Sequence, residues 1–393
     1  MEGMIGAHAP HGKPMTRPAI YLDHNAASPL LPEARSALVA ALDLVGNPSS
    51  VHGHGRALRN LIDTARGQVA ALAGAERNQV VFTGSATEAI TQAIVSGAKT
   101  FASTAIVISG GEHAAVSKAA EATGLPVVTT GLMPDGSIDL DQLAGVLAAA
   151  EGNLLVALHW VNNETGVVQD IARINALVGP TRHTLFIDAV QAFGKLPLDF
   201  AASAPDMMAV SGHKIGAPAG IGALLVKPHA DIVRLIPGGG QEQGRRGGTE
   251  AAALIAAFGA AAAAIGKRYA AAGVPRLVGR LEADLRSCIS GVVVFGTNRL
   301  GNVVNFAVPG VKNATAMMGL DLLGLSVSSG SACSSGKVGP SHVLAAMGVP
   351  PELAECALRV SLGWNSTVDD VNAFVTGYRS VLERQRARQG QAA

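Results

Sequence analysis

Short apolar runs alternate with longer amphipathic segments over the first two thirds of the chain. Between residues 57 and 73, apolar side chains recur at the spacing of one helix face, and the apolar run 79–82 that follows is short enough for a strand. Further apolar runs predict strands at residues 105–108, 126–129, 154–158, 184–187, 207–210 and 223–226. Because several of these runs are a helix length apart, we expect an α/β fold with a doubly wound, mainly parallel sheet that helices cover on both faces.

The pattern changes after about residue 268. Apolar runs at 303–308 and 358–362 predict strands, and a charged helix is expected over about 368–388, with Ser366 and Asp369 as its capping pair. These elements predict a smaller α+β domain. We therefore expect three parts, which are a flexible tail (1–17), a large domain (31–268) and a small domain formed by two segments (18–30 and 269–393).

Composition narrows the classes of partner. The 393 residues are 48% hydrophobic and carry a net charge of +1, so neither nucleic acid nor a membrane surface is expected as a partner. The alanine-rich stretch 251–265 falls short of the ~20 strongly apolar residues of a membrane span and predicts a buried or interface helix. Three cysteines without zinc spacing predict neither a disulfide framework nor a metal site. The first 18 residues lack the apolar core of a signal peptide, which predicts a cytoplasmic location.

The chemically suggestive residues follow predicted strands. Thr87, His113, Asn163, Asp188 and Lys214 all do so, and in parallel sheets ligands bind beyond the carboxyl ends of the strands. Lys214 offers an amine that can form an imine, provided that burial and nearby positive charge lower its pKa from about 10.4. Asp188 offers a carboxylate that can pair with a ring nitrogen. Together they indicate pyridoxal 5'-phosphate (PLP), although a solvated lysine and a capping aspartate are the ordinary alternatives.

Phosphate and ring contacts can be assigned on the same pattern. The turn 84–87 places backbone N–H groups and the Thr87 hydroxyl at a helix start, where anions bind, and Ser211 and His213 are positioned to complete this site. His113 is placed to cover one ring face, and Gln191 and Asn163 to reach the phenolic oxygen. Each of these also has an ordinary interpretation, as a capping turn or a satisfied polar residue.

Two residues in the last third of the chain are candidates for acting on or binding a substrate. Cys333 lies among the serines and glycines of residues 328–336, which predicts a thiol on a mobile loop, although a small loop residue is the alternative. A free thiol is only a few per cent ionised near pH 7, so its attack needs a local cation or a proton acceptor. Arg359, within an apolar strand pattern, suits a bidentate grip on a substrate carboxylate or an interdomain salt bridge.

Eight segments, in this order and spacing, resemble the cysteine desulfurases of the NifS/IscS type, within the class-V aminotransferases. The segments are YLDHNAAS (21–28), GNPSSVHGHG (46–55), TGSATEA (83–89), VNNETGVVQDI (161–171), IDAVQAFGKLPLD (187–199), SGHKIGAPAGIG (211–222), GGGQEQGRRGGTE (238–250) and SSGSACSSG (328–336). The resemblance implies the fold-type I architecture of PLP-dependent transferases, a homodimer with shared sites, and conversion of L-cysteine to L-alanine with a persulfide left on Cys333. A sulfur-acceptor or scaffold protein would then receive the sulfur.

The resemblance also implies a role for each site residue. Lys214 would bond to PLP, Asp188 would pair with the pyridine nitrogen, His113 would stack on the ring, and Gln191 and Asn163 would hydrogen bond near the phenolic oxygen. The phosphate would be held by Ala86, Thr87, Ser211 and His213, and by Thr249 of the neighbouring subunit. Arg359 and Asn163 would hold the substrate carboxylate. His24, Asn25, Gln241 and Trp364 depart from the residues that are common in the family.

Three other functions stay open from the sequence. A selenocysteine lyase or another β-eliminating enzyme would keep Lys214 and need Cys333 less, and a class-V transaminase would need no loop thiol. A catalytically silent assembly partner could keep the fold. The pathway that the sulfur serves is also open between iron–sulfur cluster assembly, nitrogenase maturation and tRNA thiolation.

Overall fold

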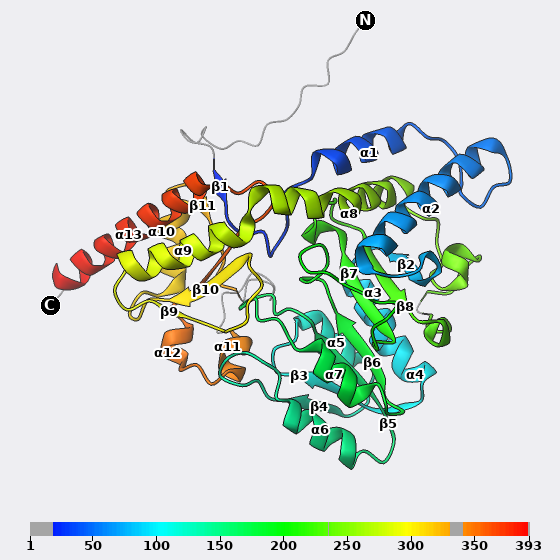
Figure 1. The fold of residues 1–393 in the computed structure, drawn as a ribbon, viewed down its shortest axis with the longest axis horizontal. Coiled ribbons are helices and arrows are strands. Elements are labelled where there is room, and N and C mark those ends of the chain that lie inside the picture. The colour runs from blue at the N-terminus through cyan, green and yellow to red at the C-terminus, as the bar shows by residue number, and fades with distance from the viewer. Residues whose placement is uncertain (1–18, 235, 331–340, 392–393) are drawn as a thin grey trace, which may run out of the picture.

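A seven-stranded sheet forms the centre of the large part of the molecule (Figure 1). The computed structural model describes residues 19–234, 236–330 and 341–391. In sheet order, the strands are β2 (Val80–Thr83), β8 (Gly222–Val226), β7 (Met207–Ser211), β6 (Thr184–Asp188), β5 (Asn153–His159), β3 (Ser103–Ser109) and β4 (Val127–Thr130). All neighbours pair in parallel except β8, which runs antiparallel to both β2 and β7. The α/β fold with a mainly parallel sheet is therefore confirmed.

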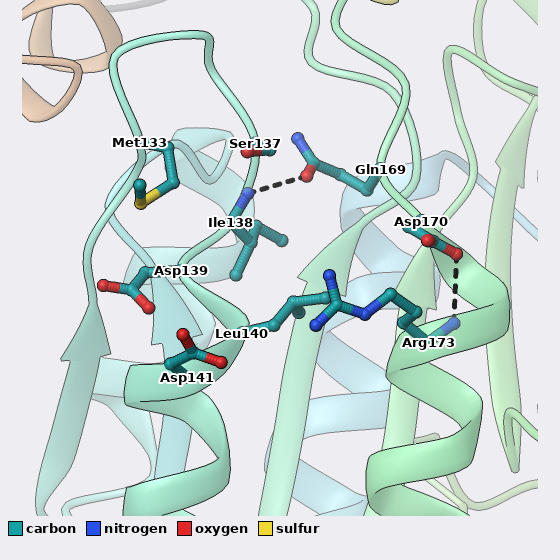
Figure 2. A pocket seen from close by; sticks show the side chains of 9 residues that line it. All are labelled: Met133, Ser137, Ile138, Asp139, Leu140, Asp141, Gln169, Asp170 and Arg173. Atoms are coloured by element: carbon teal, nitrogen blue, oxygen red, sulfur yellow. Dashed lines mark hydrogen bonds between the residues drawn. The ribbon is translucent and has the colours of Figure 1, made fainter.

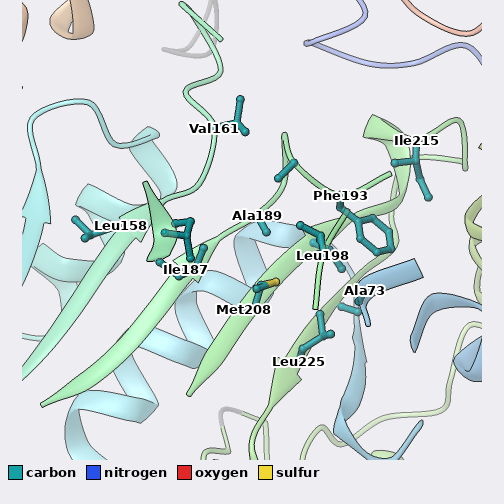
Figure 3. Close-up of a cluster of buried hydrophobic side chains, with 14 of the residues drawn as sticks. Ala73, Leu158, Val161, Ile187, Ala189, Phe193, Leu198, Met208, Ile215 and Leu225 are labelled. Carbon is teal, nitrogen blue, oxygen red and sulfur yellow. The ribbon is translucent and has the colours of Figure 1, made fainter. Parts of the chain in front are cut away.

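Apolar side chains project from both faces of this sheet. In β2, Val80 and Phe82 join one buried cluster and Val81 joins another, because successive side chains of a strand point to opposite faces. The first face, part of which is drawn in Figure 3, is covered by α2 (Gly53–Ala73), α6 (Leu140–Ala149), α7 (Ile171–Val178) and α8 (Ala252–Ala272). The second is covered by α3 (Ala86–Thr91), α4 (Gly97–Thr100) and α5 (Ala114–Ala122). Each fully buried aliphatic side chain contributes about 1.5–3 kcal/mol, so these two layers hold the sheet in place.

Helix α2 shows how the local sequence sets a helix. The ring of His52 accepts a hydrogen bond from the backbone N–H of Gly55 (3.3 Å) at its start, which is earlier than residue 57 predicted. Gly74 ends the helix in the left-handed conformation (φ 60°). On the side facing α8, a Cβ on Gly259 would lie 2.5 Å from the Cα of Ala65, so only glycine permits this close approach of the two helices.

Helix α8 confirms the prediction of a buried helix after residue 251. Its residues Ile255, Phe258 and Ile265 are almost fully buried in the core. No helix within the described ranges is long and apolar enough to cross a membrane.

A second group of elements builds a separate core. It contains β12 (Ala357–Ser361), β10 (Val303–Ala307) and β9 (Val293–Val294) in one antiparallel sheet, and β1 (Ile20–Tyr21) paired with β11 (Leu325–Ser326) in another. Helix α1 (Pro32–Leu42) packs on α8, and buried side chains of α11 (His342–Ala346) and α12 (Pro351–Ala354) join the core of the large sheet. The helices of the second core are α9 (Val274–Cys288), α10 (Asn313–Asp321) and α13 (Val368–Gln391). This core joins Leu22 to residues between Val274 and Leu382. The predicted domain limit at residue 268 falls inside α8, and the division into domains stays a prediction.

The capping pair at the start of α13 differs from the predicted one. Asp370 accepts a hydrogen bond from the backbone N–H of Thr367 (2.8 Å), and the Thr367 hydroxyl accepts one from the N–H of Asp370 (3.3 Å). The predicted pair, Ser366 and Asp369, is therefore wrong by one residue. The reason is that the Ser366 hydroxyl accepts the N–H of Gly363 (3.0 Å) and closes the preceding turn.

Candidate active site

A cavity of about 350 Å³ lies at the carboxyl edge of the large sheet. The turns after β2, β3, β5, β6 and β7 all reach it, because these strands point the same way. Its lining includes Ser85, Ala86, Thr87, His113, Asn163, Asp188, Gln191, His213 and Lys214, together with Asn25, Ala26 and His159. The structure therefore brings together most of the residues that the sequence selects.

Lys214 is held against the segment that follows β1. It ends a 3-10 turn (Gly212–Lys214) directly after β7, and its side chain is half-buried. The Nζ donates hydrogen bonds to the backbone carbonyls of Asn25 (2.6 Å) and Ala26 (2.8 Å). Two carbonyl acceptors orient the amine without neutralising its charge, and they keep it at the cavity wall that Asp188 also lines.

Asp188 is the last residue of β6 and is buried at the cavity. Burial raises the pKa of this carboxyl group, and the hydrogen bond from the Val190 N–H to Oδ1 (2.9 Å) offsets only part of the effect. A cationic ring nitrogen placed against the carboxylate would lower this pKa again. The residue therefore fits a partner that carries positive charge.

His113 begins helix α5 as its N-cap. The Nδ1 accepts the backbone N–H of Ala115 (3.1 Å), so a neutral ring carries its proton on Nε2. This hydrogen bond fixes the ring at the cavity wall, as expected of a residue that covers a planar ligand. Its role stays a prediction.

The predicted phosphate end of the cavity is formed at the start of α3. Ser85 caps this helix, accepting the N–H of Glu88 (3.1 Å), and Ala86 and Thr87 follow in its first turn. A Cβ on Gly222 would lie 2.8 Å from the backbone nitrogen of Ala86, so glycine lets β8 pass closely behind this turn. N–H groups at a helix start attract an anion by their geometry and dipole.

His213 lines the same end of the cavity, and Ser211 contacts its ring. The Ser211 hydroxyl lies 2.9 Å from the ring Nδ1 of His213, and Ser211 itself is buried behind the ring and does not line the cavity. Burial and the nearby charge of Lys214 lower the pKa of His213 to about 4. The ring is therefore neutral at pH 7, and any hydrogen bond that it gives to an anion comes from a neutral donor.

Arg359 does not line the cavity but is connected to it. It is buried on β12, where Nη2 forms an ion pair with Asp23 Oδ1 (2.7 Å) and Nη1 donates to the backbone carbonyl of Asn163 (2.9 Å). Its Nε is buried and has no hydrogen-bond partner among the described residues. Arg359 thus forms an ion pair, but its partner Asp23 falls in the same predicted small domain, so the interdomain salt bridge stays a prediction. The contact with Asn163 links Arg359 to the cavity.

Besides Ser211 and Arg359, two further predicted residues cannot be placed in the lining of this cavity. Thr249 is exposed and does not line it. Cys333 lies outside the described residues. No group of three or more potential metal-binding side chains occurs in the described parts of the chain.

A second hollow of about 210 Å³ lies away from these residues, between the turn that precedes α6 and the start of α7 (Figure 2). Asp139 and Asp170 cap these two helices, and Arg173 crosses the gap between them. This second hollow contains none of the residues that the sequence selects, so we place the site at the cavity that Lys214 lines.

Sequence reasoning missed three residues around the site. His159 ends β5 just as Asp188 ends the neighbouring β6, so the rule that selected Asp188 also applies to it. Asn25 carried no such signal, because its contacts with Lys195 and Lys214 join segments that are far apart in the sequence. Lys195 lies only four residues after Gln191, but a lone lysine is usually solvated, so nothing in the pattern selected it.

Comparisons with known proteins identify the family of the chain. The model of the class-V aminotransferase family matches residues 20–374. A cysteine desulfurase of Trichormus azollae is 39% identical over 378 residues, which cover 94% of each chain. The X-ray structure of a NifS-like protein from Rickettsia africae superposes with a TM-score of 0.84 at 32% identity, covering 93% of this chain and 99% of that one. SspA in complex with cysteine gives a TM-score of 0.75 at 29% identity, covering 87% and 98%. The chain therefore belongs to the class-V aminotransferase family and, within it, to the cysteine desulfurases of the NifS/IscS type.

Proposed function

We propose that this protein is a PLP-dependent cysteine desulfurase that converts L-cysteine to L-alanine and leaves the sulfur on Cys333 as a persulfide. One observation carries this proposal, namely that the Lys214 amine and the Asp188 carboxylate line the same cavity at the carboxyl edge of the sheet. The substrate is supported by the relatives named as cysteine desulfurases and by the structural neighbour that is in complex with cysteine.

The donors and acceptors in the cavity fit PLP. Lys214 supplies an amine for the aldehyde, and the first turn of α3 supplies N–H groups and the Thr87 hydroxyl for the phosphate. The raised pKa of Asp188 matches a carboxyl group that still lacks a positive partner, such as a protonated pyridine nitrogen. When bound, PLP supplies the electron sink for the charge left on the substrate α-carbon.

Different side chains of the protein carry out the remaining steps. Lys214 Nζ moves the α-proton of the substrate, and its two carbonyl partners hold it at the cavity wall. His113 Nε2 exchanges a proton with the substrate thiol, because Nδ1 is engaged by the Ala115 N–H. Asn163 orients the substrate carboxylate, with Arg359 behind it. Apolar side chains of Ile90, Val161 and Val190 in the lining keep water out.

The sulfur transfer uses Cys333, which is known from the sequence and lies outside the described residues. The Cys333 thiolate forms a bond to the substrate sulfur as the carbon–sulfur bond of the substrate breaks. One L-cysteine and one thiol thus become one L-alanine and one persulfide, with no external oxidant or reductant.

A shared site in a homodimer, with Thr249 reaching the neighbouring cavity, agrees with the exposure of Thr249. The acceptor protein and the cytoplasmic location stay predictions.

The test compares two thiols of the same chain. Incubation with L-cysteine should release alanine in the wild type and place a persulfide on Cys333, detected by peptide mass spectrometry. Cys333→Ala should lose both products while keeping PLP bound, and Cys288→Ala, which removes an exposed thiol elsewhere, should keep both. Lys214→Ala should lose the visible absorption of bound PLP. Full alanine formation by Cys333→Ala would contradict the persulfide step, and a preference for selenocysteine in that variant would favour a lyase.

A further inference from the structure

A second lysine lies close to the proposed cofactor lysine. Lys195 comes shortly after Asp188 in the chain, and its Nζ donates to the side-chain oxygen of Gln191 (2.7 Å) and lies 3.4 Å from Asn25 Oδ1. Lys195 and Lys214 both line a small cavity behind the site, with His24, Tyr269 and Trp364 among its other walls. None of the ion pairs among the described residues includes Lys195.

The contact with Lys195 decides how the Gln191 amide is oriented. An ammonium group has donors and no acceptor, so it can face only the oxygen of the amide. The amide nitrogen is thereby directed to the opposite side, where it donates to the backbone carbonyl of Asn25 (2.9 Å). Gln191 also lines the main cavity, so the same contact determines that the amide offers N–H groups to a ligand there.

The two lysines are joined through Asn25. Its backbone carbonyl accepts from both Gln191 Nε2 and Lys214 Nζ (2.6 Å), while its side-chain oxygen accepts from Asn302 (2.8 Å). A hydrogen-bonded path therefore runs from Lys195 through Gln191 and Asn25 to Lys214.

The charges that surround Lys195 are mostly of its own sign. Burial lowers its pKa to about 7, and the charges of Lys214 and Arg359 contribute. His24, on the segment after β1, has a pKa of about 4 and is neutral at pH 7, and Tyr269 on α8 is neutral because burial raises its pKa. Two like charges at one site repel each other, so below about pH 7, where Lys195 is protonated, its charge disfavours the protonated form of Lys214.

We propose that Lys195 is a positioning residue of the active site, which orients the Gln191 amide toward the cavity and presents a second cationic charge to the Lys214 amine. The proposal rests on the proposed function only in that Lys214 is taken as the lysine that bonds to PLP. Its first test is therefore made on the cofactor-free chain.

The first test measures the reactivity of Lys214 without cofactor. Lys214 is labelled with an amine-reactive reagent over a range of pH, and the extent is read by peptide mass spectrometry. Lys195→Met should lower the extent of Lys214 labelling severalfold below about pH 7, where Lys195 carries its charge, because a neighbouring charge shifts a pKa by about one unit. Lys195→Arg keeps the charge and should leave the extent of labelling at or above that of the wild type. An unchanged extent below pH 7 in folded Lys195→Met would overturn the charge part of the proposal.

A matched control comes from another lysine. Lys227 also donates to a backbone carbonyl, that of Ala201 (2.7 Å), but does not line either cavity. Lys227→Met should therefore leave the extent of Lys214 labelling unchanged. If Lys195→Met does not fold, as judged by its thermal unfolding, Lys195→Gln is measured in its place, since its amide keeps a polar group at the site.

The second test separates orientation from charge. PLP affinity, measured by titration of the cofactor-free protein, should fall about tenfold in Lys195→Met, the value of one hydrogen bond. In a Gln191→Ala background the same substitution should cost little, because no amide is left to orient. An equal loss in both backgrounds would overturn the role of Lys195 through Gln191. Absence of PLP binding in the wild type would contradict the proposed function and leave the labelling result standing.

Discussion

Glu112 and His159 form a buried ion pair beneath the cavity, with Glu112 Oε1 2.7 Å from His159 Nδ1. The same carboxylate oxygen accepts from the Ser109 hydroxyl (2.6 Å). His159 stands opposite Asp188 in the parallel pairing of β5 and β6. Burial alone would lower the pKa of His159, but the charge and hydrogen bond of Glu112 outweigh it, and the net pKa is raised. Glu112 therefore favours the protonated form of the His159 ring, which lies beside the carboxylate proposed to hold the cofactor ring.

Glu112→Gln should destabilise the protein in a pH-dependent way. A histidine whose pKa is raised by folding contributes stability below its unfolded pKa of about 6.5, and loses this contribution as the pH rises through the folded value. The loss relative to wild type should be about 2 kcal/mol at pH 6 and smaller at pH 9. Denaturant unfolding at the two pH values measures it. An equal loss at both would show that His159 is not charged in the folded state.

His24 should make the protein sensitive to mild acid. Burial, assisted by the charge of Lys195, lowers its pKa to about 4. Since the unfolded chain takes up this proton near pH 6.5, stability is present above that pH and is lost as the pH falls toward 4. The loss should reach about 3 kcal/mol, from a shift of about 2.5 units. His24→Phe should flatten the unfolding free energy between pH 6.5 and 4, and an unchanged slope would assign the effect to other groups.

Gly363→Ala should be severely destabilising. A Cβ at this position would lie 1.9 Å from Nδ1 of the buried His24 ring, which has little room to move. We expect a loss of at least about 3 kcal/mol, in the range of severe core overpacking. Gly145→Ala is the control, because nothing lies within 4 Å of its Cβ on helix α6 and alanine should add up to about 1 kcal/mol. His24→Ala combined with Gly363→Ala should recover much of the loss if this contact is the cause.

Arg359→Lys should affect substrate binding more than turnover. The guanidinium holds Asp23 through Nη2 and Asn163 through Nη1, and lysine cannot reproduce this planar pair of contacts. We expect the KM for L-cysteine to rise about tenfold or more, as the loss of one charge-assisted hydrogen bond implies. Asp23→Asn keeps the arginine and is the matched variant. If both variants lower the thermal stability without changing KM, Arg359 is only structural.

Much of the large sheet follows from local pattern. Each predicted strand of the large sheet is present within one or two residues of its expected limits, because an apolar run of four or five residues between polar turns is long enough for a strand and too short for a helix. The same reasoning placed Thr87, His113, Asn163, Asp188 and Lys214 at one edge, since parallel strands end together. The family motifs then supplied the chemistry.

Other features depended on contacts that no local pattern encodes. Strand β8 is antiparallel although its apolar run resembles the others, and α13 is capped one residue later than predicted because Ser366 is used by the preceding turn. The carbonyls that hold Lys214 come from Asn25 and Ala26, and the Asn25 carbonyl also accepts a hydrogen bond from the Gln191 amide. The sequence determined the elements and the edge where they meet, since periodicity and turns act over a few residues. Only the tertiary structure decided which charges face each other there, because that depends on how segments distant in the chain pack together.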